Sequence, residues 1–406
     1  MRIVVLSPRD PIPVYTGLSE RIYQLCRHLG DEHTVRVLFP HEPHRKRTES
    51  GRMPDDRPFE RVRLPSRVIN VLERRVPGYS AVKGVYKLHP WLYPGVRAEF
   101  LEFDPDAIVV EMPFLVPLAL GASRGIDAPI VLTEHNVQYK ITERLGIPGT
   151  RLMRQFEVGM IKQVDAVATV SETDHATLAE HVPAKRVVVA HNGVDTDRYS
   201  PALKRGAREI RRRHELSEPV FMYHGSLGNA QNGEAVDRLL GEVFPQLRRR
   251  YPDASLLLVG ANPPNRTPQG VVCTGLVDEL PHHIAATDVA TVPLRSGSGT
   301  KLKILEYLAT GVPVVTTTIG AEGLPIEHGE HALIADRTDR FVRETLRATR
   351  DDDLRDRLSG RGRELVESQF SWDRTLQSYN DILDELRAGD TCDRRIDIGS
   401  KISSKI

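Results

Sequence analysis

The residues best suited to chemistry stand together in the stretch RSGSGTKLKILE. Small residues and cations precede a helical pattern, and Thr300 has the side chain of a helix N-cap. Free backbone N–H groups at a helix start bind anions, and glycine lets a ligand approach them closely. The spacing therefore predicts an anion site formed by the loop residues Gly297, Ser298 and Gly299 and the helix start at Thr300, to which Lys301 and Lys303 could add charge.

Glu306 adds a second feature to this predicted helix. It lies three residues after Lys303, on roughly the same face and about one turn deeper. A carboxylate at that depth can accept hydrogen bonds from both hydroxyls of a ribose whose phosphates sit at the helix start. The combination predicts binding of a nucleotide diphosphate. Spacing alone leaves an alternative open, in which the glycines form a tight turn and Glu306 pairs with Lys303 or Lys301.

Other patterns argue against several classes of protein. No G-x-x-x-x-G-K-[ST] phosphate loop is present, and the lack of G-x-G-x-x-G after a predicted strand argues against a dinucleotide-dependent dehydrogenase. The formal net charge of +1 argues against a nucleic-acid partner. The three cysteines are far apart and lack metal-ligand spacing, and every long apolar run is interrupted. We therefore expect a cytoplasmic chain with no metal site and no membrane-spanning helix.

At 406 residues the chain is longer than one hydrophobic core usually supports, so two domains are expected. Short apolar runs alternate with helical patterns, which predicts an α/β fold of doubly wound parallel sheets covered by helices. A turn signal at Asn192 and Gly193, followed by a polar and basic stretch, places a domain boundary near residue 200. The predicted parts are domains over 1–200 and 201–370, a C-terminal helix over 371–388 and a disordered tail over 389–406.

The predicted strands place the polar loops. In the first half the strands are 2–6, 34–39, 107–110, 130–133, 166–170 and 187–190, and in the second half 220–223, 255–259, 270–273, 289–292 and 312–316. Helical patterns cover 18–29, 151–163, 233–250 and 301–310. Ligands of such sheets bind beyond the carboxyl ends of the strands. The residues that follow strands, such as EMP, TEHN and HGSLGN, are therefore predicted to line a cleft between two sheets.

Six segments, in the same order along the chain, carry a resemblance to a known family. They are VYTGLSERIYQLCRHL, LTEHN, VDAVATVSETD, VVVAHNGVDTDRY, DVATVPLRSGSGTKLKILEYLATGVPVVTTTIGAEGL and FSWDRTLQSYNDIL. They resemble the retaining family-four glycosyltransferases of the GT-B fold, also described as glycosyl transferases group 1. The resemblance implies two Rossmann-like domains facing each other across a cleft, the first binding the acceptor and the second the nucleotide-sugar donor. It also implies that the C-terminal helix crosses back onto the first domain.

The resemblance implies roles for individual residues. Glu306 matches the second glutamate of the family's E-x7-E motif, which holds the ribose. His135 matches a histidine that faces the donor sugar, and Gly17 a loop that lets acceptor and donor approach closely. The residues expected to act in catalysis are His135, Lys301, Lys303 and Glu306. The residues expected to bind the donor are Gly17, Gly225, Ser226, Arg295, Gly297, Ser298, Gly299, Thr300 and Glu322.

The chain departs from the family pattern at two places. The first glutamate of E-x7-E falls at Ser298, and Glu322 is expected to take part of its role. Ser226 and Gln231 stand at about the positions of an arginine and a lysine that follow the first strand of the family's second domain. The charge that meets the phosphates would then rest on Lys301, Lys303 and Arg295.

The family's reaction, as the resemblance implies, occurs on one face of the sugar and forms no covalent enzyme intermediate. The leaving diphosphate helps to take the acceptor proton, so the protein must supply N–H donors and positive charge to the phosphates and must align the two substrates. No metal and no cofactor is implied. The expected donor is a UDP- or GDP-linked hexose, and the expected acceptor is a glycan or a lipid-linked sugar of the cell envelope.

The segment Glu60 to Arg97 has eight arginines or lysines interleaved with apolar and aromatic residues. One interpretation is peripheral contact with an anionic membrane at the inner face of the cell membrane. The other is an amphipathic helix that packs on its own sheet and presents a solvated basic face.

Two further functions stay open at this point. A sugar-nucleotide epimerase can share the two-domain fold, although Ser298 lacks the carboxylate that acid–base chemistry around the sugar would need. A non-catalytic subunit that binds nucleotide sugars would explain Ser226, Gln231 and Ser298 together.

Overall fold

The structure is a computed structural model. It describes residues 1–388 with the exception of 15, 41–57, 65–91, 145, 147, 184–185 and 298. Three sequence predictions therefore concern residues outside the described ones: the role of Ser298, the tail over 389–406, and most of the segment from Glu60 to Arg97.

The first half of the chain forms a seven-stranded sheet in the order β3-β2-β1-β4-β5-β6-β7, and every described strand pair is parallel. Its strands are β1 (Arg2–Leu6), β2 (Thr34–Pro40), β3 (Glu60–Leu64), β4 (Ala107–Glu111), β5 (Ile130–Glu134), β6 (Ala166–Thr169) and β7 (Val187–Val189). Its helices are α1 (Gly17–Gly30), α4 (Tyr93–Phe103), α5 (Val116–Ala122), α6 (Gln138–Arg144), α7 (Thr150–Ile161) and α8 (Glu172–Ala179), with a 3-10 turn at Pro113–Leu115.

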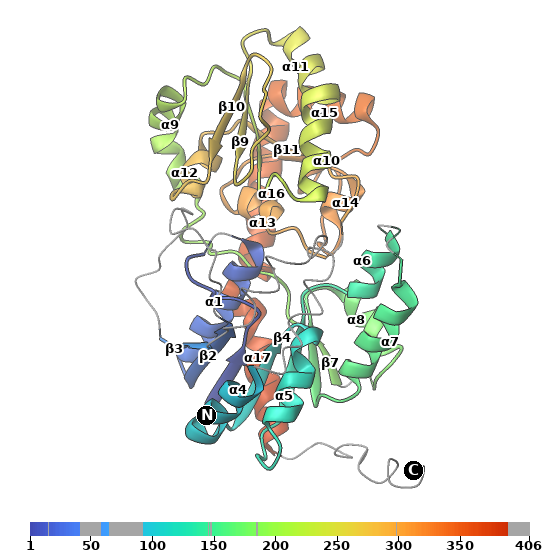
Figure 1. Cartoon of the computed structure of the whole chain (residues 1–406). Helices are drawn as coiled ribbons and strands as arrows, with labels where there is room; N and C mark the ends of the chain where they lie inside the picture. Colours follow the sequence, from blue (N-terminus) through green and yellow to red (C-terminus); the bar gives the residue numbers. More distant parts are fainter. Residues whose placement is uncertain are drawn as a thin grey trace.

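The second half forms a six-stranded parallel sheet in the order β10-β9-β8-β11-β12-β13. Its strands are β8 (Val220–His224), β9 (Ser255–Val259), β10 (Val271–Gly275), β11 (Val289–Val292), β12 (Val314–Thr316) and β13 (Leu333–Ile334). Its helices are α9 (Ala207–Arg213), α10 (Ala230–Arg238), α11 (Phe244–Arg250), α12 (Leu280–Ala285), α13 (Leu302–Ala309), α14 (Thr318–Ala321), α15 (Thr338–Arg350) and α16 (Asp352–Gln369). A 3-10 stretch (Pro201–Gly206) follows the first sheet in the chain and packs against α9 and α12, and Figure 1 shows the second half of the chain above the first.

The strands are almost continuously apolar because helices cover both faces of each sheet. In β1, Val4 and Leu6 belong to one hydrophobic cluster of the first half, whereas Ile3 and Val5 belong to another. Alternate side chains of a strand point to opposite faces, so the two clusters lie on opposite sides of the sheet. The predicted α/β fold with two Rossmann-like sheets is confirmed.

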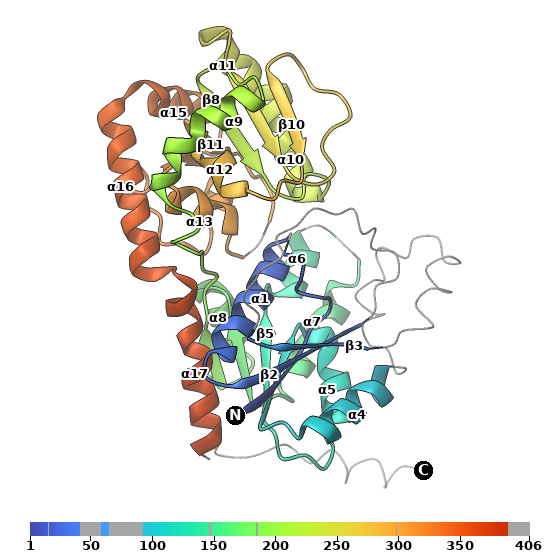
Figure 2. The same ribbon diagram turned by 90° about the vertical axis from the view of Figure 1, so that its left-hand side faces the viewer.

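The C-terminal helix α17 (Trp372–Ala388) crosses back from the second sheet to the first. Figure 2 shows α16 running beside the second sheet and α17 continuing beside the first. Trp372, Leu376 and Tyr379 of α17 are buried in the cluster that contains Ile3 and Val5. The Tyr379 hydroxyl lies 2.7 Å from the Thr133 hydroxyl at the end of β5. The crossing that the resemblance implied is confirmed.

Several element predictions need correction. β3 was not predicted as a strand, although its first residue begins the segment interpreted as a membrane contact or amphipathic helix. Arg36 of β2 pairs with Glu60 of β3, which fixes this strand at the edge of the sheet. The single helix predicted over 233–250 consists of α10, a π-helical stretch (Leu239–Val243) and α11. The domain limits near residues 200 and 370 remain predictions.

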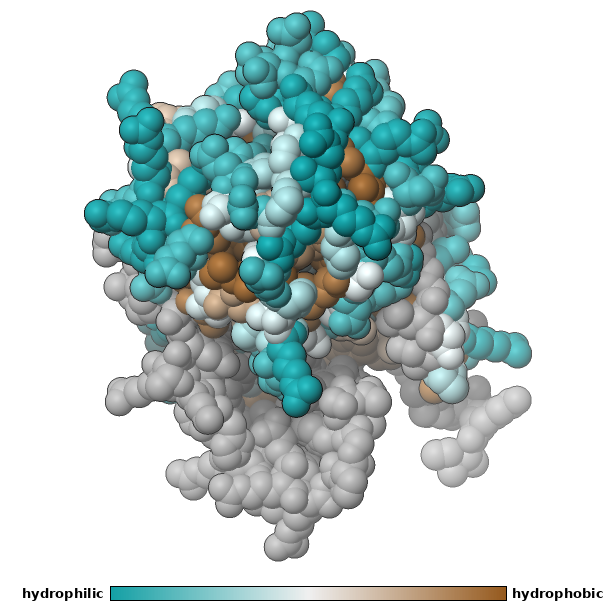
Figure 3. Space-filling view, turned by 90° about the horizontal axis from the view of Figure 1, so that it is seen from above, coloured by the Kyte–Doolittle hydropathy of each residue, from teal (hydrophilic) through white to brown (hydrophobic). Residues whose placement is uncertain are grey.

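Seen from above in Figure 3, the described surface of the second half is mostly hydrophilic, with small and separate hydrophobic patches. Among the described residues, no helix combines the length and the hydropathy that crossing a membrane requires.

Candidate active site

A cavity of about 580 Å³ lies between the two sheets, beyond the carboxyl ends of their strands. From the first half it is lined by residues of the loop before α1, of α1 itself and of the loops after β4 and β5. From the second half it is lined by the loops after β8, β9, β10 and β11 and by the first turns of α13. Eight of the predicted site residues meet here: Gly17, His135, Gly225, Ser226, Thr300, Lys301, Lys303 and Glu306.

The start of α13 differs from the prediction in one detail. Lys301, not Thr300, is the N-cap, and its side chain makes no capping hydrogen bond. Thr300 instead donates its hydroxyl to the Val170 carbonyl at the end of β6, 3.2 Å away. The Thr300 hydroxyl therefore forms a hydrogen bond between the two halves of the chain and does not cap the helix. The cation Lys301 donates to the carbonyl of Gly299 and so folds back over the turn.

The glycines of this turn allow a close approach between the two halves. Gly299 has a φ of +67°, and a Cβ there would lie 2.6 Å from the Asn136 side-chain oxygen. A Cβ on Gly17, at the start of α1, would lie 2.9 Å from Leu302. The turn before α13 is thus in contact with the loops of the first sheet.

Lys303 is held at the cavity wall by neutral groups. Its amine donates to the Tyr223 hydroxyl (2.7 Å) and to the Asn232 side-chain oxygen (2.8 Å), and lies 4.0 Å from the centre of the Tyr223 ring. Burial lowers the pKa of Lys303 to about 7, and Lys301 contributes in the same direction. A Cβ on Gly225 would lie 3.0 Å from this amine, so the absence of a side chain at Gly225 makes room for the Lys303 ammonium group. An anionic ligand would restore the full charge of Lys303.

Glu306 faces the same cavity from one turn further along α13. Its Oε1 accepts a hydrogen bond from the Tyr199 hydroxyl at 2.9 Å, and its Oε2 lies 3.2 Å from His224 Nε2. Burial raises the pKa of this carboxyl to about 7, while the hydrogen bond from Tyr199 opposes that shift. Glu306 forms no ion pair with Lys303 in the described part of the chain, which removes one form of the sequence alternative.

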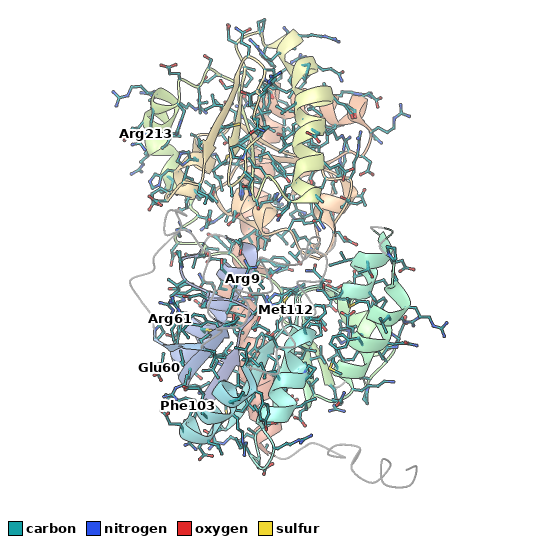
Figure 4. The ribbon with its side chains drawn as sticks, in the orientation of Figure 1. Arg9, Glu60, Arg61, Phe103, Met112 and Arg213 are labelled. Atoms are coloured by element: carbon teal, nitrogen blue, oxygen red, sulfur yellow. The ribbon has the colours of Figure 1, made fainter. Side chains whose placement is uncertain are left out.

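His135 is oriented by a carboxylate that the sequence analysis did not assign. Its Nε2 lies 2.6 Å from Glu111 Oε2, and Glu111 also accepts a hydrogen bond from the Thr133 hydroxyl at 2.8 Å. Glu111 ends β4 and was present in the EMP segment singled out as following a strand. Met112, the next residue, has a φ of +121° and lines the cavity on the side of the first sheet (Figure 4). Such backbone strain in a non-glycine residue often accompanies a functional site.

Three predicted donor-binding residues lie elsewhere or cannot be placed. Arg295 pairs with Glu242 at 2.9 Å on the surface, because α10 and its extension bring that carboxylate within reach, and does not line the cavity. Glu322 lines a smaller cavity of about 130 Å³ together with Gly299. Ser298 is outside the described residues. Gly297, with a φ of +143°, lies against Gln231 and Lys301 near the main cavity.

On the β10 and β9 side of the second sheet, the loops after these two strands also line the cavity. Its lining includes Gly260, Asn262, Val277 and the acidic residue Asp278. A Cβ on Gly260, after β9, would lie 1.7 Å from the carbonyl oxygen of Gly225, after β8, so the loops after β8 and β9 touch through their backbones. These loops therefore add both apolar and acidic side chains to the cavity lining.

Known proteins with similar sequences and structures fit this arrangement. Residues 15–198 match the family described as Glycosyltransferase Family 4, and residues 218–351 match Glycosyl transferases group 1. A GDP-mannose-dependent alpha-(1-6)-phosphatidylinositol monomannoside mannosyltransferase of Mycobacterium tuberculosis is 31% identical over 342 residues, which cover 76% of this chain and 84% of that protein. A D-inositol 3-phosphate glycosyltransferase of Corynebacterium efficiens is 26% identical over 298 residues, covering 65% and 67%.

Solved structures show the same fold at low identity. The sucrose-phosphate synthase of Thermosynechococcus elongatus superposes with a TM-score of 0.76 at 18% identity, covering 96% of this chain and all of that one. The Anabaena protein HepE, in complex with UDP-glucose, gives a TM-score of 0.69 at 16% identity and covers 95% of this chain and all of that one.

Fold, cavity and relatives together define a retaining glycosyltransferase of the GT-B fold that uses a nucleotide-sugar donor. Within that class, the chain belongs to the family-four glycosyltransferases, the glycosyl transferases group 1. The epimerase and the non-catalytic subunit that the sequence left open are thereby set aside.

Proposed function

We propose that this chain transfers mannose from GDP-mannose to a glycolipid acceptor, with the donor ribose on Glu306 and the diphosphate beside Lys303. The observation that carries the proposal is the position of these two side chains, one helical turn apart on the cavity wall. A carboxylate can accept from both ribose hydroxyls, and a buried cation can compensate the charge on the diphosphate.

The names of the relatives support the choice of sugar, nucleotide and acceptor. The Mycobacterium tuberculosis relative is named as GDP-mannose-dependent and as acting on phosphatidylinositol monomannoside. We extend this to the present chain because the alignment covers 84% of that protein. A glycolipid acceptor would be approached from the first-sheet side of the cavity, where Thr16, Glu20 and Met112 line it.

Asp278 supports a guanine base on chemical grounds. It lines the cavity in the loop after β10, an edge strand of the second sheet, next to the apolar Val277. The edge of guanine offers two neighbouring donors, N1–H and the N2 amino group, and a carboxylate can accept from both. Uracil offers a single N–H donor between two carbonyl oxygens, and a carboxylate would be repelled by those oxygens.

The catalytic roles in this proposal follow from the positions of the charges. Departure of GDP places negative charge on a phosphate oxygen, which the Lys303 ammonium and the N–H groups of the turn before α13 would stabilise. His135, fixed by Glu111, would present its second ring nitrogen to the sugar. Proton transfer from the acceptor to the leaving diphosphate then requires no further base from the protein.

The test measures nucleotide binding and sugar transfer with the purified full chain. We expect GDP to raise the Tm and UDP at the same concentration to raise it less, since a ligand that binds the native state stabilises it by mass action. Glu306→Gln should weaken GDP binding between about tenfold and a hundredfold, as expected for lost hydrogen bonds to a charged group. Mannose transfer from GDP-mannose to a lipid extract should fall with it.

The matched control is Glu242→Gln, because Glu242 pairs with Arg295 outside the cavity. It should leave GDP binding unchanged. A larger Tm shift with UDP than with GDP would contradict the proposed donor. Equal GDP affinities for the wild type and Glu306→Gln would contradict the proposed site.

A further inference from the structure

We propose that Tyr199 is a positioning residue for the donor site. Its hydroxyl holds the Glu306 carboxylate in the orientation and the ionised form that bind ribose. This role, which rests on the proposed function, belongs to the segment that joins the two sheets and not to either sheet. Tyr199 lies between β7 and β8, 107 positions from Glu306 along the chain.

The contact is direct and buried. The Tyr199 side chain lines the cavity, the residue is only 5% exposed, and its hydroxyl donates to Glu306 Oε1 at 2.9 Å. The second carboxylate oxygen lies 3.2 Å from His224 Nε2. Among the described residues, the hydrogen bond from Tyr199 is the one that holds this carboxylate, and its remaining acceptor positions can serve a ligand in the cavity.

Tyr199 is itself held in place by α16. Arg363 donates to the carbonyl oxygens of Thr196 (3.0 Å) and Tyr199 in the joining segment, and to the carbonyl of Ala309 at the end of α13. One guanidinium thus ties the backbone of Tyr199 to the helix that carries Glu306. Because both backbones are fixed in this way, the hydroxyl and the carboxylate are already close to each other, and the hydrogen bond between them costs less conformational entropy.

The charges around Glu306 explain why this hydroxyl matters. The groups that face the carboxylate are Arg198 and Tyr199 from the joining segment, Glu20 from α1, His224 from β8, and Lys303 and Tyr307 from α13. Burial and the nearby Lys303 hold the pKa of His224 well below its ordinary value, so this ring contributes no positive charge at neutral pH. Burial and Glu20 both favour the protonated form of Glu306, and the Tyr199 hydrogen bond acts against them.

The consequence for the ligand concerns ionisation. A ribose presents two hydroxyl donors, and an ionised carboxylate accepts both, whereas a protonated one loses an acceptor position. With Tyr199→Phe, the pKa of Glu306 should rise further, because a hydrogen bond to its charged form is lost. As the pH is lowered, the variant should then lose its affinity for the nucleotide at a higher pH than the wild type does.

The experiment measures the Kd of GDP by calorimetry from pH 6 to pH 9 for the wild type and Tyr199→Phe. At pH 7 the variant should bind GDP about tenfold more weakly, as expected for one hydrogen bond to a charged group. The ratio of the two Kd values should shrink as pH rises, because Glu306 ionises in both proteins at high pH. Lys303 also loses its charge in this range in both proteins, so the two Kd values are compared at the same pH.

Two controls separate positioning from general damage. Tyr307→Phe also removes a buried hydroxyl from this region, and among the described residues that hydroxyl makes no hydrogen bond with the Glu306 carboxylate. It should leave the Kd profile unchanged. The 2′,3′-dideoxy analogue of GDP lacks the groups that Glu306 binds, so wild type and Tyr199→Phe should bind it equally.

A Kd ratio for GDP that does not vary with pH, or an equal loss for GDP and its dideoxy analogue, would overturn the role of Tyr199 while leaving the donor site intact. A wild-type chain that binds no nucleotide diphosphate would overturn both this role and the proposed function.

Discussion

Two glutamates with raised pKa values illustrate what single residues contribute. Glu306 is buried beside a cavity and has Tyr199 as a donor. Glu134, the last residue of β5, is fully buried, and neither of its oxygens has a hydrogen-bond partner among the described residues. Burial raises the pKa of Glu134 well above its ordinary value, and Glu157 and Asp174 add to the effect. The first carboxyl can serve a ligand, whereas the second carries a cost to stability.

Glu134→Gln should therefore change the pH dependence of stability. The folded pKa of Glu134 is raised, so the folded state keeps a proton that the unfolded state releases above about pH 4.5. The contribution of the Glu134 carboxyl to the free energy of unfolding is therefore fully present below about pH 4.5 and is lost as the pH rises. The amide cannot ionise, so the Tm of the variant should equal that of the wild type near pH 4 and exceed it by about 3 °C or more at pH 8.

The control for this variant is Glu143→Gln on the exposed face of α6. It should leave the wild-type Tm profile in place at every pH. A Glu134→Gln profile parallel to that of the wild type would show that Glu134 is not the titrating group.

At the scale of elements, the cavity depends on how closely loops approach each other. The loops after β8 and β9 touch where a Cβ on Gly260 would lie 1.7 Å from the Gly225 carbonyl oxygen. Gly260 also has a φ of +138°, which other residues adopt at a cost. This contact sets the distance between the loop after β8, which lies beside the Lys303 amine, and the loop after β9.

Gly260→Ala should consequently destabilise the chain by about 3 kcal/mol or more, because the contacting atom is backbone and cannot move aside. Gly159→Ala on α7 is the matched substitution, since nothing lies within 4 Å of its Cβ position. It should be neutral or stabilise by about 0.5–1 kcal/mol, as alanine does within a helix. Guanidinium unfolding of both variants measures the difference, and equal midpoints would refute the close contact.

At the scale of the molecule, α17 joins the two halves into one structure. It follows α16 of the second half and supplies Trp372, Leu376 and Tyr379 to a hydrophobic cluster of the first sheet. Thr300 and Gly299 add contacts between the halves beside the cavity. The relative position of the two sheets, and with it the cavity between them, thus depends in part on α17.

Leu376→Ala removes a side chain that is 0% exposed and should cost about 2–5 kcal/mol. Leu152→Ala on α7, where the side chain is 72% exposed, makes the same chemical change on the surface and should stay within about 0.5 kcal/mol of the wild type. Guanidinium unfolding followed by tryptophan fluorescence is suitable because Trp372 lies on α17. If both variants unfolded at the same denaturant concentration, α17 would not be part of the core.

The sequence predicted the elements of the site better than its contacts. Apolar runs placed eleven strands, and the turn before α13 was identified from its glycines and lysines. The hydrogen bonds from Tyr199 to Glu306 and from His135 to Glu111 join residues 107 and 24 positions apart, which no local period encodes. Likewise, Arg295 was expected at the phosphates, but it meets Glu242, 53 positions earlier.

One sequence signal was available and was not used. The TEHN segment places Glu134 next to His135 in the chain, but Glu111 is the carboxylate that contacts the ring. Side chains alternate along a strand, so Thr133 and Glu134 of β5 must face opposite sides. The residue that shares a hydrogen bond with Thr133 is Glu111, and the alternation alone would have directed Glu134 away from the pair.

The most direct measurement is a crystal structure of this chain with GDP bound. The proposed site predicts the ribose hydroxyls within hydrogen-bond distance of Glu306, the diphosphate next to Lys303, and the guanine edge on Asp278. A nucleotide bound outside the cavity, or a ribose that leaves Glu306 in contact only with Tyr199 and His224, would contradict it.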